Sequence, residues 1–162
     1  MHALATARLV AVQRNENTED VASIRTMYKQ AGRYMTKAKL ELANCMAVGC
    51  DGYPPDAAAA TSFGLDAARD GEPTAFISMT RMGWGGRLGR TQLLAWQYFG
   101  DRLNEAGCMG DGYVANLIAF DQTIKALEQG QDPKLATDAR QQAESFWRDY
   151  GARAQKEQGC LP

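Results

Sequence analysis

Histidine is almost absent from this chain of 162 residues, and the single one, His2, stands at its beginning. A Ser-His or Cys-His catalytic pair needs an imidazole that titrates near neutral pH, so we expect no such pair. The sequence also lacks the Glu-x-x-His pairs of di-iron bundles, the HExxH motif of zinc hydrolases and the CxxCH motif of haem attachment. We therefore expect no metal, no cofactor and no histidine-based catalysis.

Long apolar runs and a large net charge are absent as well. Because no run of about 18 apolar residues occurs, we expect no membrane span. The net charge of -1 gives the chain no overall attraction for nucleic acid or for an anionic membrane. The length and the hydrophobic fraction of 45% are those of one ordinary globular domain, which we take as residues 1–162.

The N-terminal segment 1–16 is open to several interpretations. It contains arginine but no acid before Glu16, as a transit peptide would. Ala3-Leu4-Ala5 fits the small-x-small pattern of a signal-peptidase site. The simplest alternative is a short strand over 8–13 or an extended arm.

The longest expected helix covers 18–47. Its apolar residues follow a seven-residue repeat, which continues through Ala38, Leu42 and Cys45. Such a helix either crosses its own domain or pairs with a helix of another chain.

Further helices are expected at 56–69, 91–106, 113–129 and 133–156. Thr91 is a plausible N-cap for the second of these, and Asp132 followed by proline is a strong start signal for the last. The segment 74–80 fits either a short strand or a helical turn. The sequence therefore predicts an all-α, single-domain bundle of four to five helices.

Four cysteines lie at or near the expected helix ends: Cys45, Cys50, Cys108 and Cys160. An even number in turns fits two disulfides, most simply Cys45–Cys50 and Cys108–Cys160, which would contribute roughly 2 and roughly 4 kcal/mol. Disulfides imply an oxidising compartment, so this pairing predicts an exported or periplasmic protein. The alternatives are reduced thiols in a cytoplasmic protein, or a zinc site, whose CxxC spacing the chain does not match.

Three carboxylates are candidates for catalysis that uses carboxylates alone, without histidine. Asp101 and Glu105 are four residues apart on one expected helix and could act as a pair, although this spacing is typical of a solvated face. Asp121 stands on a mostly apolar helix, where a rim position or a salt bridge is the more usual role.

The segment 81–91, RMGWGGRLGRT, contains four glycines, three arginines and no acid. It is not a P-loop, because Trp84 stands where the first glycine belongs and Arg90 replaces the lysine. It is not a dinucleotide-binding fingerprint either, because Leu88 replaces the third glycine.

Two interpretations of this segment remain. Arg81, Arg87 and Arg90 beside a helix start form a generic anion site, and Trp84 adds a residue common at interface hot spots. Alternatively, the glycines permit a tight crossing between helices, Trp84 fills the core and the arginines are solvated.

Two functions from different classes are therefore expected. The first is a non-enzymatic interaction module, such as an adaptor, an inhibitor or immunity-type protein, or an assembly subunit. It would contact another protein or its own copy through the heptad helix or the loop 81–91. The second is a domain that binds a small anionic ligand through the arginines of this loop.

Overall fold

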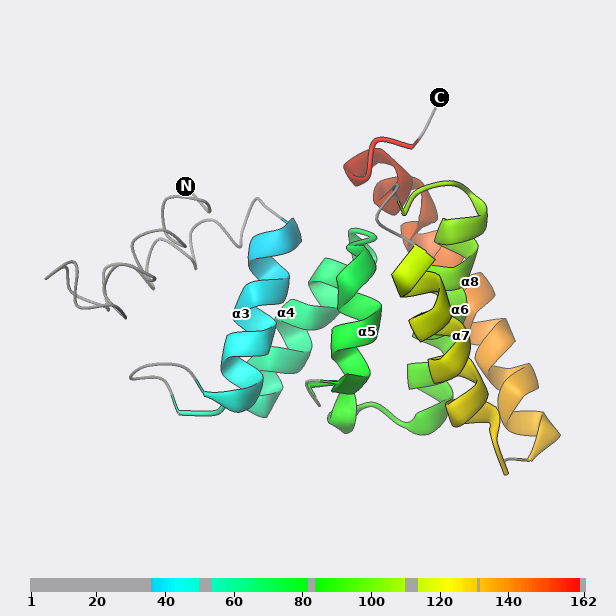
Figure 1. Ribbon diagram of the computed structural model, residues 1–162, viewed down its shortest axis with the longest axis horizontal. Coiled ribbons are helices and arrows are strands. Elements are labelled where there is room, and N and C mark those ends of the chain that lie inside the picture. Colours follow the sequence, from blue (N-terminus) through cyan, green and yellow to red (C-terminus); the bar gives the residue numbers. More distant parts are fainter. Residues whose placement is uncertain (1–35, 50–53, 82–83, 110–113, 131, 161–162) are drawn as a thin grey trace, which may run out of the picture.

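Figure 1 shows the computed structural model, which describes residues 36–49, 54–81, 84–109, 114–130 and 132–160. These residues contain no strand, and the all-α class predicted from the sequence is confirmed. They form six α-helices and one short 3₁₀ helix: α3 (Thr36–Val48), α4 (Ala57–Arg69), α5 (Pro73–Arg81), η1 (Trp84–Arg87), α6 (Arg90–Glu105), α7 (Val114–Glu128) and α8 (Pro133–Glu157).

The helices stand side by side, with α3 at one edge of the bundle and α8 at the other (Figure 1). α3 packs mainly against α4, and α6 packs mainly against α8. α5 lies between these two halves and contacts α4, α6 and α7. In the described part of the chain, no helix is long and apolar enough to cross a membrane.

Small side chains bring α3 and α4 together. Ala60, Ala67 and Ala68 of α4 are completely buried, as are Ala38 and Ala43 of α3. Because these side chains end at Cβ, the two helix backbones approach closely. Alanines therefore contribute to a closely packed core at this end of the bundle.

Aromatic side chains fill the core where α6 meets α5 and α8. The Trp96 ring stacks on Phe146 with ring centroids 4.1 Å apart, and the Phe99 ring meets Phe76 edge-on at 6.1 Å. Trp96, Phe99 and Phe76 are buried. Aromatic pairs of this kind add stability to a core beyond the stability that comes from burying their apolar surface.

Most helix ends lie where the sequence predicts them. The Asp132 carboxylate caps α8 by accepting a hydrogen bond from the Lys134 N–H at 2.9 Å. Asp56 caps α4 in the same way, and Gly130 ends α7 with a φ of 69°. That φ lies in the left-handed region, where glycine carries no steric penalty.

The segment 74–80, for which a short strand and a helical turn were both expected, is helical: α5 begins with proline at its first position and buries Ala75, Phe76, Ile77 and Met79. Two other expectations need correction. Thr91 is not the N-cap of α6, which begins one residue earlier after Gly89.

The apolar stripe of the first helix also differs from the expected one. Ala38 and Leu42 are buried as expected, but Cys45 is only half-buried, while Leu40 and Met46 are in the core. The helix segment expected over 18–35 lies outside the described residues, as does the arm or strand expected over 1–16.

Candidate functional site

The loop between α5 and α6 is anchored by a buried tryptophan. Trp84 is 1% exposed, and its backbone carbonyl accepts a hydrogen bond from the Thr61 hydroxyl at 2.5 Å. A Cβ atom built on Gly64 would lie 2.4 Å from the Trp84 ring, so the ring fills the space that this glycine leaves. The indole is therefore part of the core, and its ring is not available to a partner, contrary to its place among the contact candidates.

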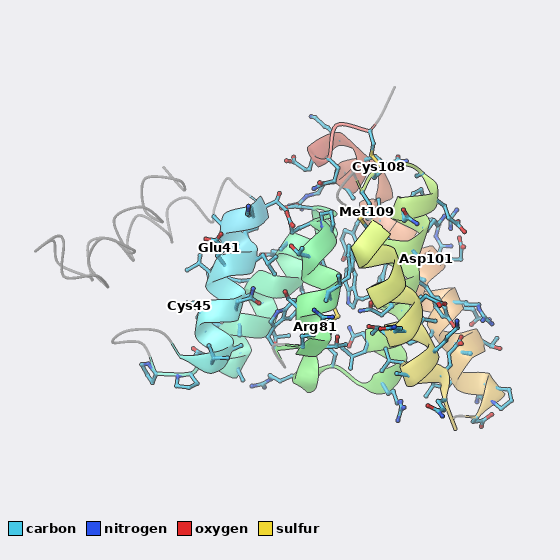
Figure 2. All side chains as sticks on the ribbon, in the orientation of Figure 1. Glu41, Cys45, Arg81, Asp101, Cys108 and Met109 are labelled. Atoms are coloured by element: carbon cyan, nitrogen blue, oxygen red, sulfur yellow. A yellow bond between two sulfur atoms is a disulfide. The ribbon has the colours of Figure 1, made fainter. Side chains whose placement is uncertain are left out.

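The first two arginines of the loop project from this anchored base. Arg81 ends α5 and Arg87 ends η1, and these two elements are in contact. Both side chains are exposed, and neither forms an ion pair or a hydrogen bond with the described residues. Figure 2 shows Arg81 among the other side chains of the bundle. Two guanidinium groups, those of Arg81 and Arg87, thus lie unpaired next to a loop that the buried Trp84 holds in place.

Arg90 has a different role. Its Nε donates to the Leu127 carbonyl at 3.1 Å, and a terminal guanidinium nitrogen donates to the Ala126 carbonyl at 3.2 Å. These carbonyls belong to the last turn of α7, where carbonyl groups lack helical partners and the helix dipole favours a cation. Arg90 therefore ties the start of α6 to the end of α7, and these donors are occupied.

The beginning of α6 has no side-chain cap. Gly89 is the N-cap residue and makes no capping hydrogen bond, and the first turn contains no acid. Gly86 and Gly89 are open to solvent, with no atom within 4 Å of a Cβ built at either position. The backbone of the loop is accordingly accessible beside Arg87.

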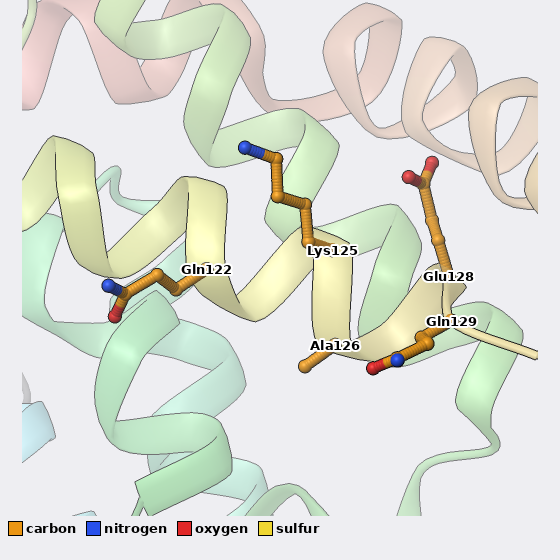
Figure 3. A pocket seen from close by; sticks show the side chains of 5 residues that line it. All are labelled: Gln122, Lys125, Ala126, Glu128 and Gln129. Atoms are coloured by element: carbon orange, nitrogen blue, oxygen red, sulfur yellow. The ribbon is translucent and has the colours of Figure 1, made fainter.

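A shallow cleft of about 560 Å³ adjoins this region on the C-terminal half of α7. Figure 3 shows the side chains that line it. Ala126 connects the cleft to the loop, because its carbonyl is one of the two that Arg90 binds. Five residues line the cleft, with two amides and one charge of each sign, but most of the exposed lining surface is apolar: Gln122, Lys125, Ala126, Glu128 and Gln129.

The carboxylates considered for catalysis lie on α6 and α7, where Asp101 is partly buried and Glu105 and Asp121 are exposed. Burial raises the pKa of Asp101 above its ordinary 3.8, and the neighbouring Glu105 and Asp121 carboxylates raise it further. Asp121 makes an exposed ion pair with Lys125 at 2.6 Å, which is the salt-bridge role expected for it. Within the described ranges, no group of three His, Cys, Asp or Glu side chains could hold a metal ion.

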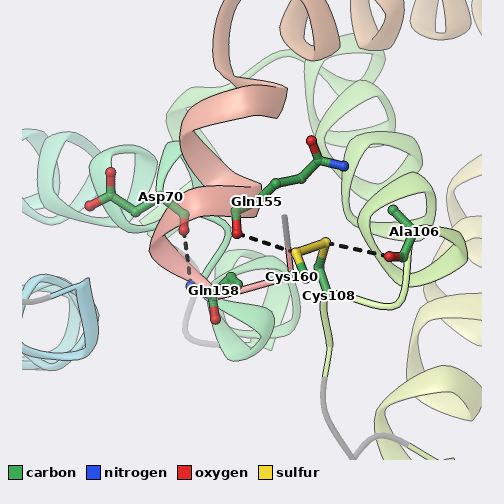
Figure 4. The surroundings of a disulfide bond; sticks show 6 residues. All are labelled: Asp70, Ala106, Cys108, Gln155, Gln158 and Cys160. Atoms are coloured by element: carbon green, nitrogen blue, oxygen red, sulfur yellow. Dashed lines mark hydrogen bonds between the residues drawn. A yellow bond between two sulfur atoms is a disulfide. The ribbon is translucent and has the colours of Figure 1, made fainter. Parts of the chain in front are cut away.

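One disulfide joins the end of α8 to the turn after α6. Cys108 and Cys160 are bonded, with their Cα atoms 5.1 Å apart (Figure 4). Cys160 Sγ lies 3.3 Å from the Gln155 carbonyl oxygen, and the turn is fixed further by Cys108 N–H donating to the Leu103 carbonyl. Cys45 is also disulfide-bonded, while Cys50 lies outside the described residues.

The buried acid Asp70 is a feature that sequence reasoning missed. Only 4% of its side chain is exposed, and its carboxylate pairs with Lys39 of α3 at 2.5 Å and with Arg153 of α8. Gln158 of α8 donates to the Asp70 carbonyl at 3.0 Å (Figure 4). In the sequence, Asp70-Gly71 indicates only a helix end, and no local pattern pairs residues that lie so far apart along the chain.

The tie between α6 and α7 through Tyr98 was missed for the same reason. The Tyr98 hydroxyl donates to the Glu128 carboxylate, and Arg140 of α8 pairs with the same carboxylate at 3.4 Å. Burial, followed by this hydrogen bond, raises the pKa of Tyr98 to about 12. Glu128 is thus engaged by two other helices, which leaves Lys125 as the more available charge of the α7 cleft.

These features describe a helical bundle with one anchored, arginine-bearing loop and a shallow cleft on α7. Comparison of the chain with protein-family models, with curated proteins and with solved structures finds no match.

Proposed function

We propose that this protein is a non-enzymatic helical interaction module that contacts a protein partner through the loop 81–91. The observation that carries the proposal is the pair Arg81 and Arg87, which are exposed and without a partner while Trp84 fixes the loop beneath them. Arginine is enriched among the residues that dominate binding energy, and a contact surface held on a packed core residue such as Trp84 loses less entropy on association.

The disulfide supports an exported setting for this function. A Cys108–Cys160 bond persists in an oxidising compartment, whereas cytosolic disulfides are rare. We therefore propose that the partner is met outside the reducing cytoplasm, as expected for an adaptor, an inhibitor, an immunity-type protein or an assembly subunit of the cell envelope. A second copy of the chain is the other candidate partner, and light scattering would detect such self-association directly.

Charge reversal on the loop tests the proposal. An Arg81→Glu/Arg87→Glu variant should lose the partner that the immobilised wild-type protein captures from an extract of the producing organism. The matched control is Lys134→Glu/Arg148→Glu on α8, which makes the same change in net charge at two other exposed positions. Equal capture by both variants, or a strictly monomeric protein that captures nothing, would contradict the proposal.

One observation favours the alternative function, binding of a small anionic ligand. The α6 N-terminus has no side-chain cap, so its N–H groups and Arg87 could bind one anion together. Phosphate or a dicarboxylate should then raise the unfolding temperature of the wild-type protein but not of Arg87→Ala. A screen in which no such anion stabilises the wild-type protein would exclude this function.

A further inference from the structure

We infer that the Cys108–Cys160 disulfide is a redox latch, whose reduction by a dithiol frees the last turn of α8 and thereby loosens α3 at the other edge of the bundle. The link runs from the disulfide through the end of α8 to Asp70, and from Asp70 to α3. The inference goes beyond the proposed function, because it concerns a different part of the molecule and does not depend on the loop 81–91.

The disulfide is the main hold on the last turn of α8. Ala154 is completely buried, but every residue from Gln155 to Cys160 is exposed or only partly buried. Cys108, to which Cys160 is bonded, belongs to the core, and Gln158 adds one hydrogen bond to the Asp70 carbonyl. A helix end with so few buried contacts opens at a low free energy once its covalent tie is broken.

The same turn covers the corner between α4 and α5. A Cβ atom built on Gly71 would lie 3.0 Å from Ala154 Cβ and 3.2 Å from Gln158 Cγ, so α8 lies directly on this corner. Figure 4 shows Gln158 reaching Asp70 from a position just before Cys160. With α8 in place, the Asp70 side chain is only 4% exposed, so release of the turn would expose it to water.

Asp70 in turn holds the beginning of α3. Its carboxylate pairs with Lys39 at 2.5 Å and with Arg153 of α8, and it accepts a hydrogen bond from the Thr36 hydroxyl at 3.4 Å. A shielded ion pair depends on all of its partners, whereas an exposed pair contributes little. Opening of α8 removes both Arg153 and the shielding, and α3 therefore loses part of its hold.

The chemical step is thiol–disulfide exchange. Cys160 is partly exposed whereas Cys108 is 5% exposed, so a thiolate of the dithiol attacks Cys160 Sγ. The S–S bond breaks, and its electron pair leaves with Cys108 Sγ, which takes up a proton. The second thiol of the reductant then displaces Cys160 from the mixed disulfide. The protein gains two electrons and two protons, and the reductant becomes a disulfide.

A full-length Cys45→Ser/Cys50→Ser variant isolates this bond, because Cys108 and Cys160 are then the only cysteines of the chain. The substitution is needed because Cys45 lies on α3 and is itself disulfide-bonded, so a reductant would otherwise perturb α3 directly. Amide hydrogen exchange, read by mass spectrometry with and without dithiothreitol, is the measurement.

Reduction should speed exchange in residues 155–160 and, about tenfold, in residues 36–48 of α3. Residues 133–145, at the opposite end of α8, provide the reference and should change much less. Reoxidation should restore the slow exchange. Circular dichroism of the reduced protein shows whether the helical fold is intact.

A second variant separates a local link from a general loss of stability. Arg153→Gln/Gln158→Ala cuts the contacts of α8 with Asp70 but leaves the disulfide in place. Its oxidised form should already show fast exchange in α3, and reduction should add little. The matched control is Gln141→Ala/Arg148→Gln, at two exposed positions of the same helix, which should respond to reduction like the parent.

Three results would overturn the inference. One is unchanged exchange in α3 after reduction, and another is an equal acceleration in α3 and in residues 133–145, which would indicate only a less stable bundle. The third is an Arg153→Gln/Gln158→Ala variant whose α3 still responds to reduction as fully as that of the control.

Discussion

At the scale of single residues, Gly64 and Trp84 share one space in the core. The indole lies where a side chain of Gly64 would stand, and Thr61 holds the Trp84 backbone from the same helix. The arrangement matches the interpretation in which Trp84 fills the core and the arginines are solvated, because the indole is buried while Arg81 and Arg87 are exposed. The sequence shows the residues of the loop, but it cannot show that a glycine twenty positions earlier makes room for the ring.

Gly64→Ala should therefore destabilise the protein despite the better helix propensity of alanine. The new Cβ would lie 2.4 Å from a ring that is fully enclosed. Alanine gains about 1 kcal/mol in propensity, whereas overpacking costs about 1–3 kcal/mol. The two terms leave a net loss of roughly 0–2 kcal/mol, and because the enclosed ring has no room to move aside, we expect the free energy of unfolding to fall by an amount in the upper part of this range, about 1–2 kcal/mol, in urea titrations.

Gly86→Ala is the matched control, because nothing lies within 4 Å of its Cβ. Its free energy of unfolding should stay within about 0.5 kcal/mol of the wild-type value. A stable Gly64→Ala variant would show that Trp84 does not fill this space.

Asp101 gives a prediction on pH. Burial and two neighbouring carboxylates raise its pKa above 3.8, so the folded state favours the protonated form and ionisation opposes folding. Asp101→Asn should consequently raise the unfolding temperature at neutral pH. The gain should shrink as the pH falls through the range just above 3.8 and should vanish below it.

Glu105→Gln serves as the comparison, since it removes one of the repelling charges but leaves the buried carboxylate in place. It should give a smaller increase in unfolding temperature, because burial is the largest cause of the Asp101 shift. A gain for Asp101→Asn that does not depend on pH would argue against a charge effect.

At the scale of elements, helix existence was far easier to predict than helix contacts. Asp132-Pro133 and Gly130 mark the ends of α8 and α7 through local chemistry, and local chemistry is readable in a sequence. The segment 74–80 was ambiguous because α5 is short and buries neighbouring positions, which leaves no clear periodicity. The hydrogen bond from Arg90 to the Leu127 carbonyl, in the last turn of α7, is a contact that no residue spacing in the sequence predicts.

Asp70 joins three helices, α3, α4 and α8, through its ion pairs. It ends α4, where the helix dipole disfavours an acid, and Lys39 of α3 and Arg153 of α8 compensate for that unfavourable charge. Asp70→Asn should lower the free energy of unfolding by about 3 kcal/mol, because it leaves the largely buried Lys39 ammonium without its partner.

Asp66→Asn removes a comparable ion pair at the surface, with Arg69. Exposed ion pairs contribute little to stability. Asp66→Asn should therefore lower the free energy of unfolding by less than about 1 kcal/mol in the same denaturation experiment. Equal effects of the two substitutions would mean that Asp70 is not a buried link between the helices.

At the scale of the whole molecule, the two halves of the bundle meet at the end of α8. Ala154 packs against Gly71, Gln158 reaches the Asp70 carbonyl, and Cys160 is bonded to Cys108. The sequence suggested the cysteine pairing from position alone, since both residues flank helices. It could not show that the same helix end also meets the turn between α4 and α5.

Removal of the Cys108–Cys160 bond should weaken the bundle substantially. The bond closes a loop with a sequence separation of 52, for which chain entropy gives a stabilisation of about 4 kcal/mol. A Cys108→Ser/Cys160→Ser variant should therefore unfold at lower urea than the oxidised wild-type protein. Reductant should lower the wild-type midpoint toward that of the variant, and an unchanged midpoint would contradict a stabilising bond.

The central claim is that Arg81 and Arg87 form the contact surface while Arg90 belongs to the fold. Labelling with an arginine-specific dicarbonyl, read by mass spectrometry on the free protein and on the partner-bound protein, tests it most directly. We predict fast labelling of Arg81 and Arg87 and slow labelling of Arg90 in the free protein. In the complex, Arg81 and Arg87 should be protected while Arg148 on α8 is unchanged. Protection of Arg148 with undiminished labelling of Arg81 and Arg87 would contradict the claim.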